Sequence, residues 1–351
     1  MLQTVGSCEQ RLFGLTPAER LTRQMAGSQS LLVADSSAVL SDAAIDWLQE
    51  HPGTILTSPG SRPLAVIVDE TTIGAARVAI EGGNHSFPAI NPAGMPDMFV
   101  RKLRRRDKLL VRSLDEQSVG TVERALFDNV YKGVTDLVTK YVWPLPAFWI
   151  TWLCARIGIV PNAATSAAIV LTVAAALLWT DGQLVAGMLC AWAMTFLDTV
   201  DGKLARVTVT SSRLGDHLDH LTDVIHPPIW WLSLALGIGQ HEPAANDDLL
   251  WRSCIVILLT YVIGRLLEVA FKLRIGYNCY MWQRFDSRFR LIVSRRNIIL
   301  LLMSVGLVFG AVLQAFVACA VWSVASTIIQ YVRYVQASRA ARSGSVPSWL
   351  M

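Results

Sequence analysis

The chain has 351 residues, of which 53% are hydrophobic and only 17% are charged, and its formal net charge is +4. An average soluble domain carries about 25% charged residues. Together with a mean hydropathy of +0.42, this composition argues against a soluble protein and predicts an integral membrane protein. The six cysteines are widely dispersed without metal-ligand spacing, which predicts free thiols and neither disulfides nor a zinc site.

Residues 1–118 are predicted to form a small α/β domain. The strand-like runs LLVA, TILT and LAVIVD alternate with helix-like segments. This region contains neither a P-loop nor a GxGxxG motif, so it shows no nucleotide-binding signature. Because the first residues lack the apolar core of a signal peptide, we expect the N-terminus to stay in the cytoplasm.

The basic run RKLRRRDK, residues 101–108, lies ahead of the apolar part of the chain. A run of this kind can bind nucleic acid, but beside a membrane domain an anionic lipid headgroup is the better partner. We therefore expect contact with membrane lipids and no nucleic acid.

Residues 119–161 are interpreted as a junction that ends in an interfacial helix. The segment PLPAFWITWLCARIGIVPN, residues 144–162, is rich in Trp and too short to span a bilayer. Its Trp149, Trp152 and Arg156 suit an amphipathic helix that lies in the membrane interface. The alternative is an early start of the first spanning helix.

Residues 162–338 are predicted to form an all-α membrane domain of six transmembrane helices. The six apolar windows long enough to span lie at about 162–180, 183–207, 212–239, 249–272, 297–315 and 316–337. The loop between the fourth and fifth windows carries a cluster of basic residues: Lys272, Arg274, Arg284, Arg288, Arg290, Arg295 and Arg296. By the positive-inside rule, this loop, both termini and the tail at 339–351 lie in the cytoplasm, which in a bacterium means an inner-membrane protein.

Five aspartates interrupt this apolar region within residues 198–223. Asp198 and Asp201 are three residues apart and Asp219 and Asp223 are four apart, so each pair shares one face of a helix. Two helices that each offer two carboxylates make a site for a hard cation, Mg²⁺ or Mn²⁺. Cations held in this way usually serve a substrate that carries phosphate. The alternative is an inert buried ion-pair network.

Arg206 and a set of small residues complete this acidic pattern. Arg206 follows the first pair of acids and is a fork-shaped donor suited to phosphate. Gly202 and Ala205 fall on the face of the first pair, and Gly215 lies one turn before Asp219. Small side chains at these positions allow a second helix or a flat ligand to approach closely.

The spacing D-x2-D-G-x2-A-R-x8-G-x3-D-x3-D, from Asp198 to Asp223, resembles the complete signature of the CDP-alcohol phosphotransferases. The resemblance covers about residues 140–337. It implies a reaction in which an alcohol attacks the β-phosphorus of a CDP-linked donor, CMP leaves and a phosphodiester forms, as in phospholipid or inositol-phosphate biosynthesis. It also implies a homodimer with its active site at the cytoplasmic face.

The resemblance assigns roles to the residues of the signature. Asp198, Asp201, Asp219 and Asp223 would hold a pair of Mg²⁺ or Mn²⁺ ions, and Asp223 would also be the general base. Gly202, Ala205 and Gly215 would line the cytidine pocket, with Arg206 near the pyrophosphate.

The sequence does not identify the acceptor alcohol. Arg213 at the mouth of the site, the intramembrane Arg265 and His226 beside Asp223 are candidate acceptor-binding residues, as are Lys132 and Lys140, which share an i,i+4 stripe with Asp136. For Arg265 a structural ion pair with Glu268 is an equal alternative, and for the lysine stripe a solvated face near the lipid headgroups is an equal alternative. The donor is either a lipid such as CDP-diacylglycerol or a soluble CDP-polyol.

The segment ERALFDNVYKGVTDLVTKYVWP, residues 123–144, resembles the junction in fused proteins that join an inositol-phosphate cytidylyltransferase to a di-inositol-phosphate synthase. Here the front segment is shorter and lacks the glycine-rich nucleotide loop, so we interpret it as a degenerate nucleotidyltransferase-like remnant. For the whole chain, the alternatives to an enzyme are a cation-binding transporter and an inactive scaffold.

Overall fold

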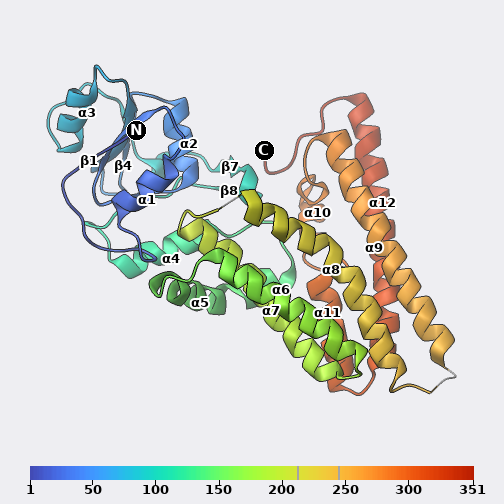
Figure 1. Ribbon diagram of the computed structural model, residues 1–351. Helices are drawn as coiled ribbons and strands as arrows, with labels where there is room; N and C mark the ends of the chain where they lie inside the picture. Colours follow the sequence, from blue (N-terminus) through green and yellow to red (C-terminus); the bar gives the residue numbers. More distant parts are fainter. Residues whose placement is uncertain (212, 244–245) are drawn as a thin grey trace. The chain divides into compact units, whose positions relative to one another are not determined.

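The computed structural model describes residues 1–211, 213–243 and 246–351, and it describes the side chains of these residues except those at 213–221. It is mostly helical with an N-terminal α/β region, as expected (Figure 1). The chain divides into two compact units. The front unit comprises Met1–Gly133, Phe148–Pro161 and Gly202–Ser211, and the second unit comprises Val134–Ala147, Asn162–Asp201 and Ser212–Met351.

The α/β part of the front unit consists of short strands and helices, with 3-10 turns at Pro92–Gly94 and Arg101–Leu103. Its strands are β1 (Leu2–Val5), β2 (Leu31–Asp35), β3 (Ala38–Leu40), β4 (Ile55–Thr57), β5 (Pro63–Val68), β6 (Ala89–Ile90), β7 (Met98–Val100), β8 (Arg105–Asp107) and β9 (Val111–Ser113). Its helices are α1 (Pro17–Gln24), α2 (Asp42–Glu50), α3 (Ile73–Ile80) and α4 (Val119–Asn129). The runs LLVA, TILT and LAVIVD form β2, β4 and β5, which confirms that part of the prediction.

A mixed sheet of order β1-β2-β5-β4-β6 forms the core of this unit. β1 is parallel to β2, β4 is parallel to β6, and β5 is antiparallel to both of its neighbours. Side chains alternate along the strands, so that Leu32 and Ala34 join one apolar cluster while Val33 joins another. Helices α1 and α2 contribute to the first cluster and α3 to the second. The sheet is therefore buried on both faces.

The remaining helices are long and apolar. They are α5 (Pro144–Arg156), α6 (Pro161–Thr180), α7 (Leu184–Val207), α8 (Arg213–Gly239), α9 (Asp247–Ile275), the short α10 (Arg284–Phe289), α11 (Arg296–Val308) and α12 (Val312–Ser343). A turn of π-helix at Val138–Val142 precedes α5, and a 3-10 turn at Cys279–Met281 follows α9. Within the described residues, α6, α7, α9 and α12 are long and apolar enough to cross a membrane, and α11 is a shorter apolar helix.

The fifth predicted window, 297–315, differs from the structure. Helix α11 ends at Val308, and the chain turns at Gly310, whose φ of 65° lies in the left-handed region that favours glycine. Helix α12 then begins at Val312 and continues past the predicted boundary at 337 into the expected tail. It runs alongside α9 (Figure 1).

Helix α5 exposes an apolar stripe. Leu145, Trp149 and Leu153, four residues apart, are exposed, while Phe148 and Thr151 are buried. The stripe is compatible with the predicted position in a membrane interface, which stays a prediction.

Large aromatic side chains fill the core of the second unit. Trp179, Trp230 and Trp231 are almost fully buried, and Trp230 Nε1 donates to the carbonyl of Thr172 at 2.9 Å, which joins α8 to α6. Gly237 lies so close to Trp179 that a Cβ added at Gly237 would be 2.1 Å from the Trp179 carbonyl oxygen. The close approach of α8 and α6 therefore requires a glycine here.

We expect Gly237→Ala to destabilise the protein, because overpacking of a filled core typically costs about 1–3 kcal/mol. The measurement is the thermal unfolding midpoint in detergent micelles. Gly120→Ala on α4 is the control, because a Cβ there would meet nothing within 4 Å and alanine favours a helix. Equal midpoints for both variants and the wild type would contradict this account of the core.

Candidate active site

Helix α7 carries the first pair of acids. Asp198 and Asp201 lie one turn apart near its C-terminal end, as their spacing predicts. Asp201 is buried, and its Oδ2 accepts a hydrogen bond of 2.7 Å from Thr165 Oγ1 on α6. Thr165 was not singled out in the sequence, because its hydroxyl meets Asp201 only through the packing of α6 on α7.

Helix α8 carries Asp223, whose carboxylate is 44% exposed. Its predicted partner Asp219 lies outside the described side chains, and so do Arg213 and Gly215. For these three residues the sequence predictions stand as predictions.

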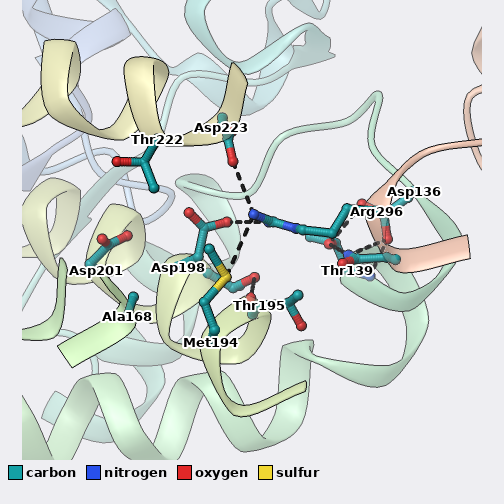
Figure 2. Close-up of polar contacts among 12 residues, drawn as sticks. Asp136, Thr139, Ala168, Met194, Thr195, Asp198, Asp201, Thr222, Asp223 and Arg296 are labelled. Carbon is teal, nitrogen blue, oxygen red and sulfur yellow. Dashed lines mark hydrogen bonds and ion pairs between the residues drawn. The ribbon is translucent and has the colours of Figure 1, made fainter. Parts of the chain in front are cut away.

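Arg296, the first residue of α11, connects the two acidic helices. Its Nη2 donates to Asp198 Oδ2 at 2.6 Å, and its Nη1 donates to Asp223 Oδ1 at 3.0 Å. Figure 2 shows its guanidinium extending between the two carboxylates. Clustered carboxylates in an apolar bundle require such a cation, because burial without one is costly.

From the sequence, Arg296 was recognisable only as one of the basic residues of the loop before α11. Its position directly before an apolar run is the signal that could have singled it out, since a charge at the end of a membrane helix needs a partner. Which acids it pairs with depends on how α7, α8 and α11 pack, and spacing alone does not give that.

His226 lies beside this ion pair. Its Nδ1 is 2.6 Å from the Thr222 carbonyl, so Nδ1 carries the proton and Nε2 is left as an acceptor. Nε2 lies 3.4 Å from Arg296 Nη1, and the imidazole ring packs edge-on against Trp230. The structure therefore brings the predicted residue His226 to Arg296 and Asp223.

A cavity of about 110 Å³ opens next to Asp223 in the second unit. Four guanidinium groups, three carboxylates and several uncharged polar groups line it. The charged residues are Arg265, Arg290, Arg295, Arg296, Asp136, Asp223 and Glu268. The excess of positive charge suits a ligand that carries negative charge.

The contacts of Arg265 fit both of its predicted roles, acceptor binding and a structural ion pair. It forms an ion pair of 3.6 Å with Glu268, and its Nη2 donates to the backbone carbonyl of Asp223 at 3.4 Å. Glu268 is shared, because Arg295 also donates to its carboxylate. Arg265 therefore shares the counterion Glu268 with Arg295, and its side chain lies at the cavity wall.

Arg290 is the least satisfied cation of the cavity. Its Nη1 is buried and has no hydrogen-bond partner among the residues that the structure describes. Burial, with repulsion from Arg295, lowers the pKa of Arg290 to about 10. The group stays charged at neutral pH, and an anionic ligand would supply the partner that its Nη1 lacks.

Asp136 closes the cavity from the junction before α5. It accepts hydrogen bonds from Asn297 Nδ2 and the Thr139 amide, each at 3.0 Å. Burial opposes its ionisation, but the charge of Arg290 and the hydrogen bonds from Thr139 and Asn297 hold the pKa of Asp136 below its usual value. Its carboxylate is therefore ionised at neutral pH.

The predicted stripe of Lys132, Asp136 and Lys140 is wrong. Residues 131–136 form no regular helix, so the i,i+4 spacing does not place the three side chains on one face. Asp136 is buried and both lysines are exposed. Neither lysine is among the described residues that line the cavity.

Three of the four residues predicted to bind CDP, Gly202, Ala205 and Arg206, lie at the end of α7 that belongs to the front unit. A Cβ added at Gly202 would lie 3.3 Å from Arg206 Nη2. The Arg206 guanidinium thus folds back over Gly202, one turn earlier, with Ala205 next to it in the chain. A larger residue at position 202 would displace this guanidinium.

Among the described side chains, no group of three or more His, Cys, Asp or Glu residues lies close enough together to hold a metal ion. The oxygen ligands nevertheless fit Mg²⁺ or Mn²⁺, because the carboxylates of Asp198 and Asp223 already converge on one positive charge. Asp219, another predicted ligand, lies outside the described side chains.

The apolar helices make this an integral membrane protein, with two carboxylates on one guanidinium beside a cavity that has an excess of arginine. Residues 158–329 match the family model of CDP-alcohol phosphatidyltransferase. Residues 158–329 belong to this family of transferases, which confirms the resemblance seen in the signature.

The chain is also similar to solved structures of the phosphatidylinositol phosphate synthase of Mycobacterium tuberculosis. The form with CDP-DAG bound has a TM-score of 0.43 and 22% identity, over 53% of this chain and 91% of that one. The form with manganese and citrate has the same score and identity over 53% and 87%, and the apo form has a TM-score of 0.39 and 21% identity over 52% and 93%. No curated protein matches the chain.

We expect Arg296→Met to destabilise the protein when divalent metal is absent, because Asp198 and Asp223 lose their shared cation. The loss is about 1–3 kcal/mol, measured as a lower unfolding midpoint in EDTA. Millimolar Mg²⁺ or Mn²⁺ should restore more of the midpoint in the variant than in the wild type.

Arg288→Met is the matched control, because Arg288 is an exposed arginine of the same basic loop. An equal loss in the control, or a loss in Arg296→Met that metal does not reverse, would show that the pairing with the two acids is unimportant.

Proposed function

We propose that the protein transfers a substituted phosphate from a CDP-alcohol to a second alcohol that itself carries an anionic group, with release of CMP. The observation that carries the proposal is the arrangement of Asp198 and Asp223 around Arg296, at the wall of a cavity with an excess of arginine. Membership of the CDP-alcohol phosphatidyltransferase family supports the reaction class.

Asp223 is the proposed general base. It borders the cavity, its carboxylate is partly exposed, and the adjacent guanidinium of Arg296 favours the ionised form that can accept a proton. The acceptor oxygen gives its proton to Asp223 and forms a bond to the β-phosphorus of the donor. The bond from that phosphorus to CMP breaks, and its electron pair leaves on the phosphate oxygen of CMP.

We infer that Asp198, Asp201, Asp219 and Asp223 hold one or two Mg²⁺ or Mn²⁺ ions. Divalent cations bound there would neutralise the pyrophosphate oxygens and stabilise the negative charge of the leaving CMP. Arg296 contributes a permanent positive charge to the same acids and orients Asp198 and Asp223 toward each other.

We assign the donor site to Gly202, Ala205, Arg206 and Gly215. Gly202 leaves room for the Arg206 guanidinium over the helix surface, where its fork of donors suits a phosphate. The donor is a lipid such as CDP-diacylglycerol or a soluble CDP-polyol, and the experiment below separates the two.

The acceptor site is the cavity beside Asp223. Within the described residues, Arg290 offers a buried N–H without a hydrogen-bond partner, Arg265 shares Glu268 with Arg295, and His226 presents Nε2 next to Arg296. These groups favour an alcohol that carries a phosphate over a neutral alcohol. A phosphorylated polyol fits this description, and Arg213 is a further candidate contact.

We propose that α8 and α11 complete six membrane crossings with α6, α7, α9 and α12. Helix α11 begins at Arg296 inside the site and has 13 residues. It is therefore about 20 Å long, which is less than the thickness of the hydrocarbon core. The basic residues between α9 and α11 favour a cytoplasmic site and cytoplasmic termini. A homodimer, which the family resemblance implies, is part of the proposal.

The alternative functions have less support. A cation transporter needs acids spread across the membrane, whereas Asp198 and Asp223 are gathered at one point and share Arg296. An inactive scaffold needs no buried donor aimed at a ligand, whereas Arg290 Nη1 lacks a hydrogen-bond partner among the described residues.

The direct test is CMP release by the purified protein with Mg²⁺ or Mn²⁺. CDP-diacylglycerol and CDP-inositol are each paired with polyols, their phosphates and water. Release with one donor and a phosphorylated acceptor is expected. Asp223→Asn should lower the rate by about 10²–10⁴-fold, because it removes the general base. No release with any pair, or unchanged release from Asp223→Asn, would refute the assignment.

We also expect Arg290→Ala to raise KM for a phosphorylated acceptor by about tenfold, because a hydrogen bond to a charged group is lost. KM for the donor should not change, and neither should the rate with the corresponding unphosphorylated alcohol. Arg288→Ala is the control. An equal effect on both acceptors would place the phosphate elsewhere.

A further inference from the structure

The C-terminal end of α7 is held by two arginines from the start of the chain. Arg20 Nη1 donates to the carbonyl of Val207, and Arg23 Nη1 donates to the carbonyl of Thr208 at 2.8 Å. The last carbonyls of a helix have no partner within it, and cations at that end also complement the helix dipole. These two contacts therefore cap the helix that carries the signature.

Within the described residues, the Arg20 guanidinium donates to the Val207 carbonyl, and the charge of Asp42 favours its ionised form. Arg20 is only 4% exposed, its Nε has no hydrogen-bond partner in the described part of the chain, and burial lowers its pKa to about 10. A buried guanidinium is costly. Neither the proposed chemistry nor the apolar core of the front unit requires it.

Helix α1, which carries both arginines, is firmly anchored. Thr16 and Glu19 form a capping box at its N-terminus, Pro17 occupies its first turn, and Leu21 is fully buried in the core. The cap and the buried Leu21 hold in place the helix from which Arg20 and Arg23 extend.

A third contact holds α7 one turn earlier. Lys203 is 3% exposed, lies 3.1 Å from the centre of the Tyr131 ring, and donates to the Val130 carbonyl at 3.4 Å. Val130 is the C-cap residue of α4. The end of α7 is therefore held from α1 and from α4.

The backbone just beyond α7 is strained. Val209 has a φ of 51°, in the left-handed region that β-branched residues rarely adopt. Such a conformation persists only where its surroundings hold it in place, and the neighbouring Thr208 carbonyl is the one that Arg23 binds.

Residues 202–206, which include the donor residues of the proposed function, contain Lys203 and directly precede Val207, and they belong to the same compact unit as residues 1–133. We propose that the front unit is a structural part of the donor site, in which Arg20, Arg23 and Lys203 are positioning residues that hold Gly202 and Arg206 for the CDP group. This inference rests on the proposed function. It gives the front segment a role in transfer.

The test uses the full-length protein with Arg20→Ala, Arg20→Lys and Arg23→Ala. Steady-state kinetics give KM for the CDP-alcohol and for the acceptor, and hydrogen exchange follows the amides of residues 204–210. Both alanine variants should raise the donor KM by about tenfold or more, because each removes a charged hydrogen bond. The acceptor KM should stay unchanged, residues 204–210 should exchange faster, and Arg20→Lys should recover most of the donor affinity.

Arg77→Ala is the matched control, because Arg77 is an exposed arginine near the C-terminal end of α3 in the same unit. Arg23 is exposed, so Arg23→Ala decides the question if Arg20→Ala fails to fold. Unchanged donor KM and unchanged exchange in Arg23→Ala, or equal changes in Arg77→Ala, would overturn the proposal. If the wild type releases no CMP, the proposed function is wrong, and the exchange rates alone then decide whether the arginines hold α7.

Discussion

The pairing of Arg296 with Asp198 and Asp223 is the interaction on which the second unit depends. Carboxylates in an apolar bundle are tolerated only with a cation beside them, and one guanidinium reaches both at hydrogen-bonding distance. It fixes where α7, α8 and α11 meet, and it explains why α11 starts at Arg296. The acids are consequently gathered at one point beside the cavity, where a phosphate-bearing substrate can be bound.

Ion pairs and hydrogen bonds also hold the charged residues that line the cavity. Glu268 pairs with both Arg265 and Arg295, and Asp136 accepts hydrogen bonds from Thr139 and Asn297, so that among the described residues Arg290 Nη1 is left without a hydrogen-bond partner. A site that combines an ionised carboxylate with unpaired arginine favours deprotonation of an alcohol that arrives with its own negative charge. This is the link between the packing of the helices and the transfer reaction that we propose.

Local patterns in the sequence predicted local structure well. The strand-like runs form β2, β4 and β5, and the acid spacing led to the family. Arg296 was not predicted, because its partners are 73 and 98 residues away. The same holds for Arg20, which contacts a carbonyl 187 residues further along the chain. The prediction that Lys132, Asp136 and Lys140 share one helix face was wrong, because residues 131–136 form no regular helix.

The central claim is that the signature acids hold divalent metal beside Arg296. A structure of the full-length protein with Mn²⁺ and a CDP-alcohol, solved with anomalous data, tests it most directly. The account predicts a manganese signal within about 2.3 Å of carboxylate oxygens of Asp198 and Asp223, with the CDP pyrophosphate on the same ion. A manganese signal elsewhere, or none while the donor is bound, would contradict it.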